Sequence, residues 1–543
     1  MSFMQKIKKI DWVVLAILLV NISLIAYCFS LKTDFHVDEY FTFGHANSTQ
    51  GAFLVKDVTT LSENLPVKCF KPDDVRDYLT VQQNRRFEYQ NVVNNLKVGV
   101  HPPLYYFMVH TISSFFPNTF SRWLIFPINI GFFILTFFAL YKFAQDIFSD
   151  KIKIYLTLIL WGFCITTLNM SVFIRSYMMQ MFIGTYLLYR HYQLIQKEQI
   201  NFASLFQIFL FSYLGFLTHY YSLVFIFLLA AITCCYFVCS RQFKNLFKYA
   251  AVMLLSVVLF LCSFPAVIDV FLHTSRGIEV QELNLFSYYK YHIALSRLTN
   301  FVMTYVFAFR HPYYEFFAFF MIMGASIIIL QKGSRNISTR IKVMTAFVIL
   351  FMFFIYLISP EMFIHDDRYL SPIVPLLCLL VIYYFSLLIH LCNLSNKVIN
   401  IILAVMVFLN VFYTNWQERS GYFLHITQNT QDVLEKLKGK NVVLLMKYWH
   451  GGFSFIVDYP LFSSFCMFDI LDKDEMLQQM HEKKYDYLLL YQTEESSTDK
   501  LGKATRSDYV EKNLHYDALT FEKTFKKGLY IYDLYKIGSD VKK

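Results

Sequence analysis

Apolar residues fill long stretches of this chain without alternating with polar ones. Residues 132–140 and 401–412 are two examples among many. At helix length, an apolar stretch without alternation is typical of a membrane span, which needs about 20 residues. We therefore predict a polytopic α-helical membrane protein.

The apolar pattern predicts about eleven membrane-spanning helices, and about thirteen if two shorter segments also cross. The predicted spans are 11–29, 122–144, 153–171, 174–190, 204–219, 221–240, 249–271, 314–331, 343–359, 372–392 and 399–415. The shorter segments, 104–116 and about 298–310, are expected to be juxtamembrane or partly inserted helices. The first span follows several lysines, as a signal peptide does. It is long and lacks a small-residue cleavage site, so we expect the helix to be retained.

Short basic loops predict the orientation of the spans. Residues 190–197, 241–248 and 332–342 are rich in Lys and Arg, and 142–153 is a weaker loop of the same kind. The positive-inside rule puts these loops in the cytoplasm together with the N-terminus. Because the number of spans is odd, the C-terminal tail is then expected outside.

Two larger polar regions are expected on the outer face. Residues 30–101 are charged and poorly periodic, and we interpret them as a first extracytoplasmic loop with juxtamembrane helices. Residues 416–543 differ in composition and are predicted to form a small soluble α/β domain after a transmembrane domain, 1–415. Its strand-length apolar runs are 441–446, 485–491 and 528–537.

Composition agrees with a membrane protein. The hydrophobic fraction is 56% and the charged fraction only 16%, which excludes an ordinary soluble protein of this length. The net charge of +10 lies largely in the loops between spans, so it requires no nucleic-acid partner. Most cysteines lie in or beside apolar spans, where they act as small hydrophobic residues. Cys69 and Cys466 lie in polar segments and could pair if both face an oxidising compartment.

The predicted topology brings ionisable residues from different loops and span ends to the outer face. They are Asp38, Glu39, His101, Arg175, His219, Asp366, Asp367 and Arg368. A membrane enzyme that works at the outer interface needs such a cluster, whereas a passive scaffold does not.

Asp38 and Glu39 are candidates for general-base chemistry. A carboxylate can take the proton of an acceptor hydroxyl, and partial desolvation raises its pKa toward the value this task needs. The alternative is a solvated acidic pair at a helix end.

Arg175 and Arg368 are candidates for phosphate binding, because guanidinium groups recognise phosphate oxygens through paired donors. Arginines on the outer face also run against the charge bias of the loops. An ion pair of Arg368 with a neighbouring Asp is an equally good interpretation.

The two histidines have structural alternatives. His101 precedes two prolines, which fit the start of a helix, so a capping role is possible for it. His219 lies beside tyrosines at a span end, where packing in an interfacial belt is the usual role.

Together these motifs resemble a known family. They are DEY at 38–40, HPPLYY at 101–106, RSY at 175–177, THY at 218–220 and RYLSP at 368–372. In order and spacing, residues 1–415 resemble the membrane glycosyltransferases of the GT-C fold. The resemblance is to the branch shared by protein O-mannosyltransferases and lipid A aminoarabinose transferases, glycosyltransferase family 39. One departure is Phe173, at a position where the family commonly has an acidic residue.

The resemblance implies a GT-C-like fold and an inverting glycosyl transfer. The donor would be a polyprenyl-phosphate-linked sugar, and the acceptor a lipid, glycan or protein hydroxyl of the cell envelope. Asp38 would be the general base, with Glu39 supporting it or binding the acceptor. The reaction would take place at the outer, periplasmic face of a bacterial inner membrane.

The same resemblance implies the binding residues. Arg175 and Arg368 would hold the lipid phosphate and neutralise charge on the leaving group. His101 and His219 would orient groups in the pocket, and the neighbouring tyrosines of the arginine motifs belong to the same site. These are Tyr177 and Tyr369.

A divalent metal is required by some relatives and not by others. Asp38, Glu39, His101 and His219 could supply ligands, although no spacing in the sequence requires a metal.

A polytopic transporter or flippase is the main alternative function. Transporters tend to carry ionisable residues and broken helices near the bilayer midplane. Here the ionisable residues lie mainly at span ends, which favours an interfacial enzyme. A third interpretation, a C-terminal binding module on a membrane anchor, does not explain so many spans.

Overall fold

The computed structural model describes most of the chain. The described residues are 11–49, 51–52, 54, 68–70, 72–98, 101–195, 199–273, 337–358, 367–417, 426–446, 452, 454–469, 485–492, 519–527 and 530–538. The predicted span 314–331, the short segment 298–310 and Asp366 lie outside these residues.

The chain forms two compact units. The first, here called the helical unit, comprises Met1–Cys28, Val100–Tyr105 and Ile125–Ser420. The second, here called the sheet unit, comprises Phe29–Gly99, Tyr106–Leu124 and Gly421–Lys543. The C-terminal region therefore forms one unit with the predicted first loop, a combination that the sequence did not indicate.

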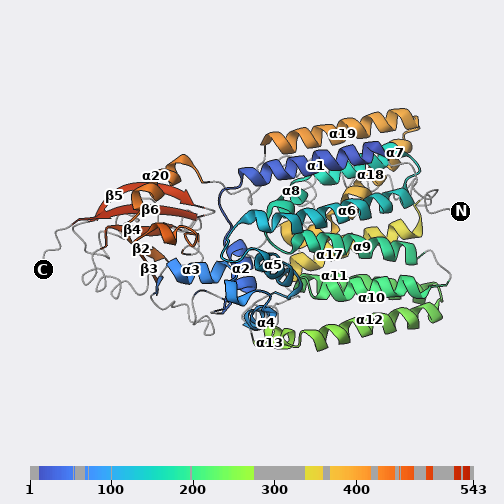
Figure 1. The fold of residues 1–543 in the computed structure, drawn as a ribbon. Helices are drawn as coiled ribbons and strands as arrows, with labels where there is room; N and C mark the ends of the chain where they lie inside the picture. Colours follow the sequence, from blue (N-terminus) through green and yellow to red (C-terminus); the bar gives the residue numbers. More distant parts are fainter. Residues whose placement is uncertain are drawn as a thin grey trace. The chain divides into compact units, whose positions relative to one another are not determined.

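The helical unit consists of long apolar helices. Its helices are α1 (Trp12–Leu31), α6 (Phe126–Ile147), α7 (Lys151–Phe163), α8 (Ile165–Val172), α9 (Tyr177–Leu194), α10 (Phe202–Phe216), α11 (Tyr220–Cys239), α12 (Phe243–Ser263), α13 (Ala266–His273), α17 (Thr339–Ile358), α18 (Val374–His390) and α19 (Asn396–Gln417), with the 3₁₀ helix η8 (Asp367–Ile373) before α18. Helix α9 packs against α6, α10 and η8, and α11 packs against α12 and α17 (Figure 1).

Six helical segments among the described residues are long and apolar enough to cross a membrane. They are Trp12–Leu31, Arg122–Ile147, Tyr220–Cys239, Phe243–Ser263, Thr339–Ile358 and Arg368–His390. A seventh arises if α7 and α8, which are bent by 53° at their junction, count as one broken span. The described residues are thus mostly helical with six or seven candidate membrane spans, which supports the prediction of an α-helical membrane protein.

Three further predicted spans form helices that are shorter or less apolar than a full membrane span. Helix α10 and the apolar part of α19 are shorter than a full span. Helix α9, predicted as the span 174–190, carries Gln180, Arg190 and His191, which lower its hydropathy. Most of its side chains are buried by neighbouring helices, so α9 lies inside the bundle and needs little lipid-facing surface.

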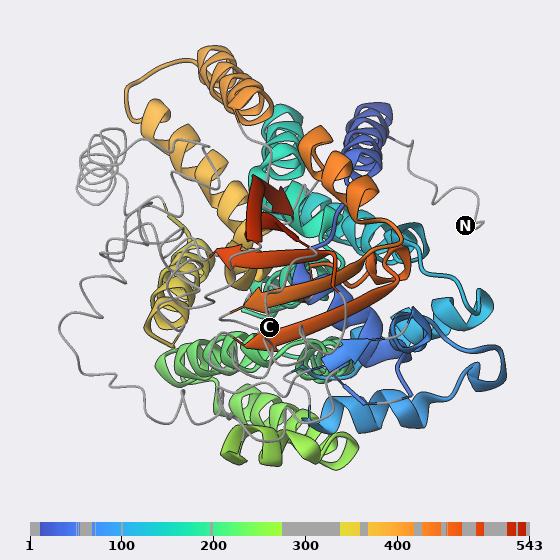
Figure 2. The same ribbon diagram turned by 90° about the vertical axis from the view of Figure 1, so that its left-hand side faces the viewer.

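The described residues of the sheet unit form a sheet of six strands in the order β1-β3-β2-β4-β6-β5. Figure 2 shows its C-terminal strands in orange and red. The strands are β1 (Lys68–Phe70), β2 (Asn441–Met446), β3 (Ser464–Asp469), β4 (Tyr487–Gln492), β5 (Leu519–Lys527) and β6 (Tyr530–Ile537). Strand β2 runs parallel to β3 and β4, while β6 is antiparallel to β4 and β5. The strand-length apolar runs of the sequence thus correspond to β2, β4 and β6, and α20 (Gln428–Leu437) packs on β5.

Strand β1 joins this sheet from the predicted first loop. It pairs antiparallel with β3, and Cys69 stands opposite Cys466 in the register. The two cysteines form a disulfide across 397 residues of sequence. The pairing that the sequence left open is therefore present, and it links the first loop covalently to the C-terminal region.

Short helices complete the sheet unit. They are α2 (Val37–Asn47), α3 (Pro72–Leu79), α4 (Tyr89–Val98) and α5 (Leu104–Phe115), with η2 (Gln83–Arg85) between α3 and α4 and η3 (Arg122–Leu124) after α5. Helix α2 is buried along almost its whole length and packs against α3 and α4. Helix α5 corresponds to the short apolar segment predicted at 104–116.

A close approach at Gly184 positions η8 on α9. A Cβ atom at Gly184 would lie 2.7 Å from Cβ of Pro372 and 3.0 Å from its carbonyl oxygen. Only a residue without a side chain lets the two backbones come this near. Gly184 therefore fixes the distance between α9 and the segment that carries Arg368 and Tyr369.

Replacing Gly184 with Ala is expected to destabilise the protein by about 1–3 kcal/mol, because the added methyl group forces η8 away from α9. Gly131→Ala is the matched control, since a Cβ at that helical glycine of α6 meets nothing within 4 Å. The measurement is the unfolding of each variant in detergent micelles. Equal stability of the two variants would contradict the packing argument.

Candidate functional site

The predicted site residues fall into two clusters, one in each unit. Asp38 and Glu39 belong to the sheet unit. The remaining predicted residues, His101, Arg175, Tyr177, His219, Arg368 and Tyr369, belong to the helical unit.

In the helical unit, Asn129 holds the turn that presents Arg175. Helix α8 ends at Val172 and α9 begins at Tyr177, which leaves Arg175 in the short connection. The Asn129 amide of α6 donates to the carbonyl of Phe173 at 2.8 Å. Its oxygen accepts a hydrogen bond from the Tyr105 hydroxyl at 2.9 Å. Phe173 thus contributes to this turn through its backbone carbonyl.

The segment that follows His101 is tied to the turn before α11. The backbone N–H of Leu104 donates to the carbonyl of Leu217 at 2.9 Å. Two residues later, His219 caps the N-terminus of α11, because its Nδ1 accepts from the N–H of Tyr221 at 3.1 Å. The ring of His219 thus serves as a helix cap at α11.

The six residues of the helical unit form one cluster. Arg175 donates a hydrogen bond to Nε2 of His101. The His219 ring centroid lies 5.3 Å from that of His101 and 5.2 Å from that of Tyr177. The Arg368 guanidinium lies 5.9 Å from the centre of the Tyr177 ring and 5.1 Å from that of Tyr369.

Burial and hydrogen bonding define the charge of this cluster. A guanidinium can only donate, so Nε2 of His101 is an acceptor. Burial, together with the positive charges of Arg175 and Arg368, lowers the pKa of His219 to about 3, which keeps the ring neutral at pH 7. Since Nδ1 of His219 accepts, its proton is on Nε2.

The cluster therefore has the donors of an anion site. Arg175 and Arg368 are each only 5% exposed, and His219 is 3% exposed. Nε2 of His219 has no hydrogen-bond partner among the described residues. Two guanidinium groups and one N–H donor thus lie in a largely buried place, where charge-assisted hydrogen bonds are strong.

Two further residues support the cluster and were not singled out from the sequence. Asn129 holds the turn before Arg175, and nothing in the apolar span around it indicated that role. Tyr221 packs its ring 4.5 Å from the Tyr369 ring and stacks on His219 at 5.5 Å. Tyr221 directly follows the THY motif at 218–220, and this position could have indicated its role from the sequence.

In the sheet unit, Asp38 and Glu39 occupy the first turn of α2. His36 is the N-cap residue, and its Nδ1 accepts from the N–H of Asp38 at 3.1 Å. Glu39 completes a capping box, since its Oε2 accepts from the N–H of His36 at 2.7 Å. This reciprocal pairing fixes the start of the helix and with it the position of Asp38.

The two carboxylates have different environments. The Glu39 side chain is fully buried and forms an ion pair with Lys32 at 2.7 Å. Burial lowers the pKa of the Lys32 ammonium, although the charge of Glu39 acts in the opposite direction. The Asp38 side chain is 23% exposed, and its Oδ2 lies 3.8 Å from Nδ1 of His36. The pair is thus not a solvated one.

For Glu39, two roles were expected, either to support Asp38 or to bind the acceptor. Its environment favours the first. A carboxylate buried against an ammonium supports the helix start but has no surface for an acceptor molecule. Asp38 has the exposure that proton transfer to and from a substrate requires.

A metal site is not evident in the described part of the chain. None of its groups of three or more His, Cys, Asp or Glu side chains is arranged to hold an ion. The potential ligands named from the sequence have other partners, since Glu39 pairs with Lys32 and Nδ1 of His219 caps α11.

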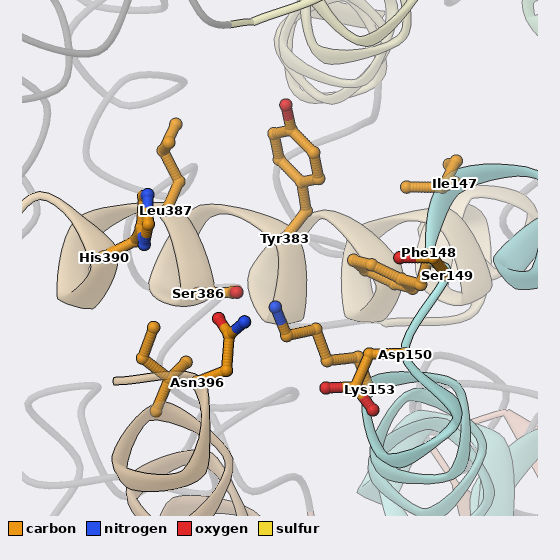
Figure 3. A pocket seen from close by; sticks show the side chains of 11 residues that line it. Ile147, Phe148, Ser149, Asp150, Lys153, Tyr383, Ser386, Leu387, His390 and Asn396 are labelled. Carbon is orange, nitrogen blue, oxygen red and sulfur yellow. The ribbon is translucent and has the colours of Figure 1, made fainter. Parts of the chain in front are cut away.

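A cavity of about 360 Å³ lies elsewhere in the helical unit (Figure 3). Lys153, Tyr383 and His390 are among its lining residues. Along α18, the lining residues Tyr383 and His390 lie roughly 14 Å and roughly 24 Å from Val374, the first residue of the helix after η8. None of the predicted site residues lines it.

Glu39→Gln is expected to destabilise the protein by about 3–5 kcal/mol, because the buried Lys32 ammonium then loses the charge of Glu39. Asp38→Asn is expected to change stability by at most about 1 kcal/mol, the usual size of a helix-dipole interaction. Unfolding in detergent measures both. A double variant, Lys32→Met with Glu39→Gln, should recover stability, and its failure to do so would contradict the ion-pair explanation.

The comparisons with known proteins leave the family open. No protein-family model matches the chain, and no curated protein matches it in sequence.

Proposed function

We propose that this protein is a membrane glycosyltransferase that uses a polyprenyl-phosphate-linked sugar as donor. The observation that carries this proposal is the buried cluster of Arg175, Arg368 and His219. Its donors suit the oxygens of a phosphate, and its positive charge favours an anionic leaving group.

The position of the cluster supports a phosphate that belongs to a lipid. His219 directly precedes the apolar helix Tyr220–Cys239, and Arg368 begins the apolar segment Arg368–His390. Both residues therefore lie at the end of a membrane-spanning segment. In a bilayer this level is occupied by lipid phosphates.

Asp38 supplies the other half of the proposed reaction. Its carboxylate takes the proton of the acceptor hydroxyl while the acceptor oxygen forms a bond to the anomeric carbon of the sugar. The bond from that carbon to the phosphate oxygen breaks, and the polyprenyl phosphate leaves with the electron pair. Attack opposite to the leaving group inverts the configuration, and the two arginines stabilise the developing phosphate charge.

The loop charges and the disulfide support an orientation. The loop charges predict that Asp38, Arg175 and Arg368 lie on the outer face of the membrane. The disulfide between Cys69 and Cys466 lies in the unit that carries Asp38, and disulfides persist in oxidising compartments such as the periplasm. We propose a bacterial inner membrane with the site on its periplasmic side.

Asp38→Asn is expected to lower the transfer rate by about 10²- to 10⁴-fold, the usual contribution of a general base. The donor for the assay is the lipid-linked sugar that accumulates in a deletion strain, and envelope fractions of that strain serve as acceptors. Asp73→Asn is the matched control, because Asp73 also lies in the first turn of a helix of the sheet unit and is 77% exposed.

Undiminished transfer by Asp38→Asn would remove Asp38 from the role of base. If the purified protein instead moves the lipid across liposome membranes without transferring sugar, it is a flippase and the proposal is wrong.

His219→Phe is expected to raise the KM for the lipid donor by about 10- to 100-fold, since a hydrogen bond to a charged group contributes about 1.5–3 kcal/mol. His219→Gln retains a donor and should lose less. Transfer measured at a series of donor concentrations checks both. An unchanged KM for the Phe variant would exclude His219 from the phosphate site.

A further inference from the structure

The end of the β5–β6 pair carries two residues with different surroundings. Lys527 ends β5 and Tyr530 begins β6, and the two stand opposite each other in the register (the red strands of Figure 2). Lys527 is almost fully buried, whereas Tyr530 is half-buried.

Lys527 ties this end of the sheet to the segment that leads into α2. Its ammonium lies 2.8 Å from Oδ2 of Asp458 and 3.5 Å from Oδ1 of Asp34. Asp34 precedes Asp38 by only four residues, and its Oδ1 also accepts from the N–H of Phe35 at 2.9 Å. Since all of these side chains are buried, the contact holds the β5–β6 end at the approach to Asp38.

Tyr530 lies within electrostatic reach of Asp38. Burial raises the pKa of the Tyr530 hydroxyl, and the charges of Tyr491 and Asp38 act in the same direction. The effect of Asp38 agrees with the geometry. Lys527 stands opposite Tyr530 in the strand pair, and it contacts Asp34, four residues before Asp38.

Tyr530 belongs to a group of aromatic rings on β4 and β6. The Tyr491 ring lies 5.6 Å from the Tyr530 ring at an angle of 71°, and it lies 5.6 Å from the Tyr532 ring. Tyr532 is fully buried and its hydroxyl bonds to Ser454, so it is a fixed partner for the Tyr491 ring. Tyr491 and Tyr530 keep part of their surface exposed.

We propose that Tyr491 and Tyr530 form the acceptor-binding surface beside Asp38 and that the acceptor is a saccharide. This inference rests on the proposed function. Aromatic faces pack against the apolar C–H faces of a sugar ring, while the phenol hydroxyl bonds to sugar hydroxyls. A surface of tyrosines next to a carboxylate therefore suits a molecule that is rich in hydroxyls and carries no charge of its own. The C-terminal region thus selects the acceptor.

The experiment uses the full-length protein in detergent. Transfer is measured with the accumulated lipid donor and with oligosaccharides released from the cell envelope by mild acid. Tyr530→Ala and Tyr491→Ala are expected to raise the KM for the oligosaccharide at least 10-fold and to leave the KM for the donor unchanged. Phe521→Ala is the matched control, since Phe521 is an exposed aromatic residue at the opposite end of the same strand pair.

A binding measurement keeps the inference separate from the proposed function. Saturation-transfer NMR detects contact between the oligosaccharides and the protein without any reaction, and Tyr530→Ala should abolish the signal. If Asp38→Asn is inactive but both Tyr variants keep the acceptor KM, only the saccharide surface is wrong. If the envelope protein or lipid fractions accept sugar and the oligosaccharides do not, the acceptor class is wrong. If no transfer occurs but binding depends on Tyr530, the proposed reaction fails and the saccharide surface stands.

Discussion

The buried ion pairs around residues 32–39 are the constraint on which the candidate site of the sheet unit depends. Lys32 pairs with Glu39, and Lys527 pairs with Asp34 and Asp458, all with little or no exposure to water. Unpaired, each buried charge would cost several kcal/mol, so these partners cannot separate cheaply. Asp38 lies between these paired residues in the sequence, and its side chain is 23% exposed. Its position is therefore a consequence of charges that never contact a substrate.

In the helical unit, the buried charges of the cluster are two guanidinium groups that lie among aromatic rings. This unit holds the guanidinium groups of Arg175 and Arg368 in a largely buried place, and it surrounds them with rings that tolerate positive charge. Tyr177 and Tyr369 offer their faces to Arg368, and burial keeps His219 neutral so that it adds a donor without adding charge. Such a place is ready for an anion before the anion arrives, which is what preorganised electrostatic stabilisation requires.

The sequence predicted those helices and strands that form from a pattern within their own residues. The apolar helices and the runs that become β2, β4 and β6 were readable because each shows its own periodicity or length. Strand β1 was not, because its three residues carry no pattern and acquire one only from β3. The different environments of Asp38 and Glu39 were equally unreadable, since they depend on where Lys32 is buried. Likewise, the hydropathy of α9 did not reveal that its neighbours enclose it.

The disulfide and strand β1 have a consequence for biosynthesis. Cys69 leaves the ribosome 397 residues before Cys466, a delay of roughly 20–80 s at ordinary translation rates. During that time most of the apolar helices are made and inserted, while neither the disulfide nor the pairing of β1 with β3 can form. The sheet unit is therefore the last part of the molecule to mature. A ribosome that stops before residue 466 leaves the first loop without this covalent link to the C-terminal region.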